Sequence, residues 1–234
     1  MNGSAKPSSR GPSNATLAVV CILLAATCVP AMTAAARKEP DRVWVHPQFE
    51  RFALPRIAVL PAVAVEGGLD ICPFVEKRWT SVAGGARMRW LPTVLTRSRL
   101  KAGGHDSLLT RLGRDVLRIG RVDSTMAPQI AGALGVRGLL SLRVDLWRRE
   151  NSPVRGRTLA VVGLTAALVD SSGTLLWSAA GREEHEVGSI SQFTEEFGQA
   201  PADFDSALTG LVGRWGAILS AVPAPAPAPP TRGP

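Results

Sequence analysis

Two long strand-like segments joined by a tight turn constrain the fold most. Between residues 158 and 169, apolar side chains recur at every second position, which is the period of a half-buried β-strand. The segment Asp170–Ser171–Ser172–Gly173 has the composition of a turn, and residues 174–187 then start apolar and end polar. The sequence therefore predicts an antiparallel β-hairpin centred on Asp170.

A third strand is predicted directly before this hairpin. In residues 136–147, one face carries Leu140, Leu142, Val144 and Leu146, and the opposite face ends at Trp147. Together the three segments predict an antiparallel meander. We expect Trp147 to pack beneath a helix.

Helical periodicity fills most of the remaining chain. Apolar residues at spacings of three and four predict helices over 72–83, 92–100, 106–119, 124–134 and 202–222, and short β-branched runs predict strands over 56–61 and 87–91. Glycines follow the expected ends of the helices 106–119 and 124–134. The order of elements predicts an α/β (α+β) domain over 56–222: one mixed sheet, with the three-strand meander at its carboxyl-terminal side, covered by helices.

The amino-terminal segment 1–36 has the pattern of an export signal. Lys6 and Arg10 precede an uncharged stretch that ends in small residues, with Ala36 as the expected cleavage position. Two other fates stay open. Cys28 is a candidate for lipidation, although the residues before it match a lipobox poorly, and the uncharged stretch approaches the roughly 20 residues that a membrane anchor needs. We rank soluble export first, lipidation second and a spanning anchor third.

The other ends of the chain are expected to lie outside the core. Residues 37–55 form a mixed lead-in, and residues 223–234 form a disordered Ala/Pro-rich tail. After cleavage at Ala36, Cys72 is the one cysteine left, so no internal disulfide can form. We expect Cys72 to be a buried apolar residue.

Three stretches of this pattern resemble a known family. They read RIAVLPA from Arg56, IAGALGVRGLLSLRVDLW from Ile130, and VGLTAALVDSSGTLLWSAAG from Val162. The scheme is similar to periplasmic and outer-membrane-associated bacterial lipoproteins with the fold of the TolB amino-terminal domain, an architecture shared by the curli secretion channel subunit and the lipoprotein activators of penicillin-binding proteins. The resemblance covers about residues 56–222 and implies a fold and a compartment, but no catalytic activity.

No motif of a catalytic, metal or cofactor site is present in the sequence. The chain has no phosphate-binding glycine loop, nucleophile elbow, paired cysteines or zinc-binding helix motif. His185 and Glu183 would share one strand face, but two ligands are too few for a metal site. We therefore predict no catalytic residues, no metal and no cofactor.

One surface is a candidate for an anionic partner. Four arginines recur at spacings of three and four along the helix 106–119 and just beyond it: Arg111, Arg114, Arg118 and Arg121. The net charge of +8 agrees with such a partner, while the sequence has no signature of nucleic-acid binding.

These observations favour a non-enzymatic, exported cell-envelope protein that binds an envelope protein or an anionic envelope polymer. The oligomeric state stays open, as does membrane association through the amino terminus. The alternatives are a module that binds a small ligand between sheet and helices and, ranked last, an exported hydrolase. A hydrolase predicts a cleft with clustered titratable side chains, a ligand module predicts a largely apolar pocket, and a partner-binding module predicts an exposed apolar or arginine-lined patch.

Overall fold

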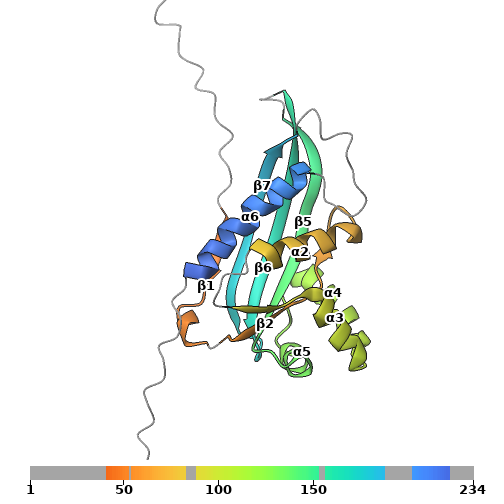
Figure 1. The fold of residues 1–234 in the computed structure, drawn as a ribbon, viewed down its shortest axis with the longest axis vertical. Helices are drawn as coiled ribbons and strands as arrows, with labels where there is room; N and C mark the ends of the chain where they lie inside the picture. Colours follow the sequence, from red (N-terminus) through yellow and green to blue (C-terminus); the bar gives the residue numbers. More distant parts are fainter. Residues whose placement is uncertain (1–40, 53, 83–87, 153–155, 188–201, 222–234) are drawn as a thin grey trace, which may run out of the picture. The chain divides into compact units, whose positions relative to one another are not determined.

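A seven-stranded mixed sheet forms the centre of the domain (Figure 1). The structure is a computed structural model that describes residues 41–52, 54–82, 88–152, 156–187 and 202–221. The strands run in the order β1-β7-β6-β5-β2-β4, and β3 pairs with β5 beyond the end of β2. The α/β class expected from the sequence is confirmed. The expected signal or anchor, with Cys28 and Ala36, and the tail 223–234 lie outside the described residues.

The meander is present, with its first two strands longer than expected. Strands β5 (Gly138–Ser152), β6 (Arg157–Asp170) and β7 (Leu175–Glu186) pair antiparallel in sequence order. At the hairpin turn, the Asp170 carboxylate accepts hydrogen bonds from the backbone N–H groups of Ser172 and Thr174. This side-chain bonding explains why an Asp-Ser-Ser-Gly segment turns the chain here.

The other strands lie at the two sides of the meander. On one side, β2 (Arg56–Val59) pairs parallel with β5, β4 (Arg89–Leu91) pairs parallel with β2, and β3 (Val63–Ala64) pairs parallel with β5. On the other side, β1 (Arg42–Val45) pairs antiparallel with β7. Strand β1 falls within the segment 37–55, the expected lead-in, so the sheet extends into that segment.

Helices lie on both faces of the sheet. The helices α2 (Cys72–Val82) and α6 (Ala202–Ala221) pack on the face that carries Leu140, Val162 and Trp177. The helices α3 (Thr93–Ala102), α4 (Asp106–Ile119) and α5 (Ala127–Leu134) gather with Ala58, Leu139 and Val169 on the opposite face. Short 3-10 turns, η1 (Phe49–Arg51) and η2 (Leu69–Ile71), complete the described elements. No helix in these stretches is both long and apolar enough to cross a bilayer.

Helix α5 starts three residues later than the sequence predicts. The Asp123 carboxylate accepts hydrogen bonds from the backbone N–H of Thr125, at 2.8 Å, and from its hydroxyl, at 2.5 Å. This local bonding holds residues 123–126 in a turn instead of a first helical turn.

A β-bulge at Asp145 corrects one expectation about β5. The register with β6 shifts between Val144 and Leu146, so alternation restarts there. As a result Leu146 does not share the face of Leu140 and Val144. Trp147 instead returns to the α6 side, where its ring stacks on Phe204 with centroids 4.8 Å apart. Packing of Trp147 beneath a helix is confirmed.

Candidate binding groove

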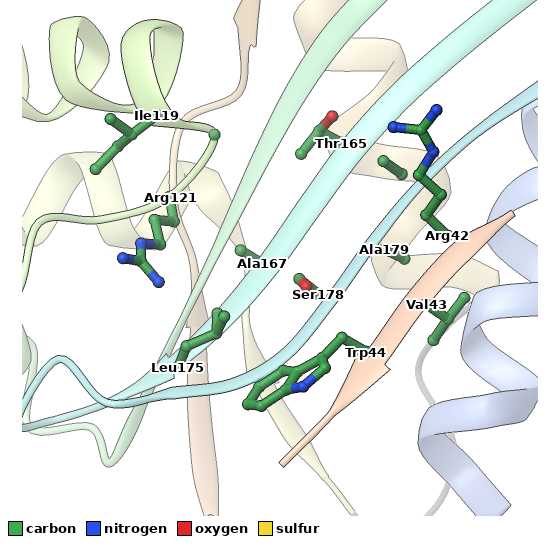
Figure 2. A pocket seen from close by; sticks show the side chains of 12 residues that line it. Arg42, Val43, Trp44, Ile119, Arg121, Thr165, Ala167, Leu175, Ser178 and Ala179 are labelled. Carbon is green, nitrogen blue, oxygen red and sulfur yellow. The ribbon is translucent and has the colours of Figure 1, made fainter.

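A groove of about 500 Å³ opens where the helical layer over the sheet ends. Helix α4 finishes above β5, and the neighbouring strands β6, β7 and β1 form the groove on the same face. Figure 2 shows its lining, which comes from β1, from the end of α4 and from strands β6 and β7: Arg42, Val43, Trp44, Ile119, Gly120, Arg121, Thr165, Ala167, Leu175, Ser178, Ala179 and Ala180.

The floor consists of small side chains in register across the sheet. One cross-strand row runs from Trp44 of β1 through Ser178 of β7 to Ala167 of β6. The next row runs from Arg42 through Ala180 to Thr165. Because Ala and Ser project little from the sheet, the strands leave a hollow between the bulkier side chains at both sides.

The two walls expose bulky apolar side chains. Trp44 on β1 is 43% exposed and Ile119 at the end of α4 is 39% exposed. Leu117 lies two residues before Ile119 in the last turn of α4, and its side chain is also exposed. Large apolar residues this accessible on both sides of a hollow are typical of a binding surface.

Gly120 allows the end of α4 to approach the sheet closely. Its φ of +73° ends the helix in the left-handed conformation, and a Cβ built there would lie 3.1 Å from Thr165 Cγ2. Its carbonyl oxygen also accepts a hydrogen bond of 3.3 Å from the buried Ser141 hydroxyl on β5. Both the backbone conformation and the close approach to β6 therefore require glycine at this position.

A polar network beside the groove fixes the same wall. Arg143 on β5 donates to the carbonyl oxygen of Leu117 at 3.2 Å, which places a cation at the carboxyl end of α4. Arg143 also pairs with Asp145 at 2.6 Å, and the Thr165 hydroxyl donates to the other oxygen of Asp145 at 2.6 Å. The hydroxyl proton of Thr165 is thus already used within the protein.

The ionisable side chains that line the groove are Arg42 and Arg121. An arginine stays protonated and cannot exchange protons at ordinary pH, so this lining offers no general acid or base. It does offer guanidinium N–H groups, which bind carboxylates in a planar, often bidentate geometry.

The arginine stripe is exposed, but it does not form one helix face. Arg111, Arg114 and Arg118 lie on the solvent side of α4, whereas Arg121 follows the helix end and lines the groove. Hydrogen bonds from Thr125 lower the pKa of Asp123, and the charges of Arg111 and Arg118 add to this effect. Arg111 and Arg118 therefore lie close to an acidic side chain, Asp123, whereas Arg121 lines the groove.

The other residues considered from the sequence lie elsewhere. His185 is exposed near the end of β7, and Glu183 pairs with Arg214 of α6. Among the described residues, no cluster of three or more His, Cys, Asp and Glu side chains is arranged to hold a metal ion.

Cys72 is buried at the start of α2. Burial, with the nearby Glu76 carboxylate, raises the pKa of this thiol to about 11. The thiol is therefore almost entirely protonated at neutral pH, which makes it a poor nucleophile.

Glu76 gives a first testable prediction. Burial raises the pKa of this carboxyl, although its oxygen accepts the backbone N–H of Ala62 at 2.8 Å and lies 3.5 Å from Arg97. Because the folded state then holds the proton more tightly than the unfolded state, the protonated Glu76 stabilises the fold in acid. This contribution is lost as the pH rises from the unfolded pKa of about 4.5 through the raised pKa of the folded state. Glu76→Gln should remove this part of the pH dependence, measured by urea unfolding between pH 4 and pH 8.

Glu76→Ala is the matched variant for the hydrogen bond. It leaves the buried N–H of Ala62 without an acceptor and should cost about 1–3 kcal/mol at pH 7. Glu76→Gln, which keeps a carbonyl oxygen in place, should be at least as stable as the parent at that pH. A Gln variant with the unchanged pH profile would contradict the assignment to Glu76.

The sequence missed most of this groove. The sequence singles out Arg121, but as part of a helix face, and it includes Trp44 in the mixed segment 37–55. One usable signal existed: Ala167, Ser178 and Ala180 are small residues at outward-facing strand positions, which marks a hollow if nothing covers them.

Comparisons with known proteins do not assign a family. No protein-family model and no curated protein matches the chain. Solved structures with a related arrangement include Lipoprotein GNA1162 from Neisseria meningitidis, with 15% identity, a TM-score of 0.44 and coverage of 70% of this chain and 94% of that chain. A PelC dodecamer from Paraburkholderia phytofirmans has 21% identity, a TM-score of 0.42 and coverage of 77% and 95%.

A third similar structure is the hypothetical protein CT253 from Chlamydia trachomatis, with 9% identity, a TM-score of 0.45 and coverage of 72% and 94%. At TM-scores below 0.5, these likenesses assign neither a function nor a family. The resemblance to the TolB amino-terminal domain stays a prediction.

Proposed function

We propose that the chain is a non-enzymatic, exported cell-envelope protein that holds a partner in the groove between β1 and the end of α4. The observation that carries this proposal is the exposed lining: Trp44 and Ile119 face a hollow of small residues beside two arginines. The pattern of residues 1–36 supports export, because a positive start, an apolar stretch and a small-residue end are typical of secretory signals.

The chemistry of the lining favours binding over catalysis. A hydrolase needs a nucleophile activated by a base, or a pair of acids, within reach of a substrate. Arginine can stabilise negative charge but cannot take up a proton. The Thr165 hydroxyl does contact an acid, Asp145, but Arg143 pairs with that carboxylate, and Asp145 does not itself line the groove.

The proposal is tested by filling the groove. Ser178→Trp places a large ring on the floor next to Trp44 and should abolish partner recovery, measured by proximity labelling in the native cell envelope. Thr110→Trp is the matched control, because Thr110 is exposed on α4 and does not line the groove. Thermal unfolding of both variants checks that they remain folded.

Two results would overturn the proposal. Labelling that finds cytoplasmic neighbours alone would remove the export argument. A folded Ser178→Trp variant that recovers the same envelope partner as the parent would show that the groove is not the binding surface.

A small-ligand module is the second candidate, favoured by the size of the groove. Its volume of about 500 Å³ lies within the range of about 300–1,000 Å³ common for small-molecule sites. Native mass spectrometry of protein purified from the envelope distinguishes the two: a retained small molecule that is absent from Ser178→Trp would favour this candidate.

A further inference from the structure

The groove combines apolar walls with few hydrogen-bonding groups. Its side-chain polar groups are the guanidinium groups of Arg42 and Arg121, the indole N–H of Trp44 and the hydroxyls of Thr165 and Ser178, and the Thr165 hydroxyl already donates to Asp145. A sugar chain presents a hydroxyl group on most ring carbons, and each one that is buried without a partner costs free energy. The lining is therefore better suited to an apolar side chain than to a glycan.

The hollow of about 500 Å³ is larger than one bulky side chain and has room for part of a peptide segment. Trp44 stands on β1, across the row of Ser178 and Ala167 from the α4 wall, and Ile119 stands on that wall (Figure 2). In protein interfaces, a bulky apolar side chain that enters such a depression contributes much of the binding free energy. Because β7 and β6 separate β1 from β5, Trp44 and the α4 wall lie three strand spacings apart, roughly 14 Å, so a segment along this row would cover both exposed side chains.

The charged side chains that line the groove are both positive. Arg121 follows Gly120 directly, and Figure 2 shows its side chain between Ile119 and Leu175 at one side of the groove. No acidic residue lines the groove, and Arg118 and Arg114 lie exposed on the adjoining helix. A partner with a carboxylate beside its apolar side chain would therefore gain a charge-assisted hydrogen bond, whereas a cationic partner would be repelled.

We infer that the groove docks a segment of a partner protein in which a bulky apolar side chain stands beside an Asp or Glu. The segment lies along the row from Trp44 to the α4 wall, with its apolar side chain over the floor of Ser178 and Ala167, and Arg121 binds the carboxylate. This inference rests on the proposed function and adds the chemistry of the partner to it.

Site-specific crosslinking in the full chain tests the inference. The photoreactive residue p-benzoylphenylalanine replaces Ile119 at the groove wall, and the protein is irradiated in its native cell envelope. We expect an adduct that proteinase K digests, and mass spectrometry should place the crosslink in a segment that carries Asp or Glu within a few residues of a large apolar side chain.

A charge reversal tests the role of Arg121. In the crosslinking background, Arg121→Glu should lower the adduct yield about tenfold, the effect of losing about 1.4 kcal/mol of affinity. Arg114→Glu makes the same charge change on the exposed face of α4 and should leave the yield within about twofold. A synthetic peptide of the mapped segment, with its acidic residue replaced by Lys, should bind Arg121→Glu better than it binds the parent protein.

The outcomes separate this inference from the proposed function. An adduct that resists proteinase K, as with a glycan or lipid, or that maps to a segment without an acidic residue, overturns the inference and leaves groove binding intact. Equal adduct yields from Arg121→Glu and Arg114→Glu also overturn the inference and leave groove binding intact. The absence of any adduct, together with unchanged partner recovery by the groove-filled Ser178→Trp, overturns both.

Discussion

Replacing Trp177 with Ala should lower the free energy of unfolding by about 3–5 kcal/mol, the usual cost of truncating a large buried aromatic residue. Trp177 on β7 is fully buried, and its ring lies between those of Trp79 on α2 and Trp215 on α6, with centroids 6.1 Å away in both cases. The side chain therefore joins the sheet to both helices of this face. Urea unfolding monitored by far-ultraviolet circular dichroism measures the change.

Two variants control this prediction. Trp177→Phe keeps an aromatic ring, and the buried indole N–H that it removes has no hydrogen-bond partner in the structure, so its cost should be clearly smaller. Trp44→Ala removes an exposed tryptophan and should change stability by no more than about 0.5 kcal/mol. Equal losses for Trp177→Ala and Trp44→Ala would contradict the packing described for this core.

Replacing Arg214 with Ala should also destabilise the fold, by about 2–4 kcal/mol, because it removes the guanidinium group that pairs with two largely buried carboxylates. Arg214 on α6 pairs with Asp41 through two hydrogen bonds of 3.0 and 3.1 Å, and it also pairs with Glu183 of β7. The side chains of Asp41 and Glu183 are only 14% and 17% exposed. Thermal unfolding and urea unfolding measure the loss.

The surroundings of Asp41 show why this ion pair matters to the fold. The Trp215 indole N–H donates to the same carboxylate at 3.1 Å, so the residue before β1 is held by two neighbouring side chains of α6. A Cβ on Gly181 would lie 2.3 Å from the Asp41 carboxylate, so only glycine leaves room for it. Arg214→Ala should therefore loosen β1, which carries the Trp44 wall of the groove.

Arg157→Ala is the matched control for Arg214→Ala. Arg157 pairs with Glu186, but both side chains are exposed, by 61% and 46%, and water screens such pairs. Its loss should cost at most about 1 kcal/mol. If Arg157→Ala and Arg214→Ala cost the same, burial does not set the strength of the Arg214 pairs.

The elements that the sequence predicted well are those with strong periodicity. Helix α4 has the expected bounds, 106–119, because Leu112 and Val116 repeat at helical spacing and Gly120 ends the helix. The hairpin around Asp170 follows from the same kind of local signal: two strand-like segments and, between them, a turn in which the Asp170 carboxylate accepts hydrogen bonds from the backbone. Such patterns reflect interactions within a few residues, and a single sequence contains them in full.

The packing of Trp147 beneath a helix is predicted correctly, but the sheet face on which it lies does not follow from the sequence, for a physical reason. Alternation along β5 places it opposite Val144, and a single extra residue at Asp145 reverses that assignment. Asp145 is held there by Arg143 on its own strand and by Thr165 on β6. The bulge thus depends on a contact between residues 20 positions apart, which no local pattern reveals.

By itself, the sequence determined the order of the strongly periodic elements and the antiparallel meander, because the spacing of apolar residues follows the period of each helix and strand. The groove was decided only by the tertiary structure. It exists because α4 stops over β5 and because β1, from a segment without clear periodicity, joins β7 and brings Trp44 opposite the end of that helix. Whether a sheet face is covered depends on where distant segments meet in space, and hydrophobic spacing along one chain does not contain that information.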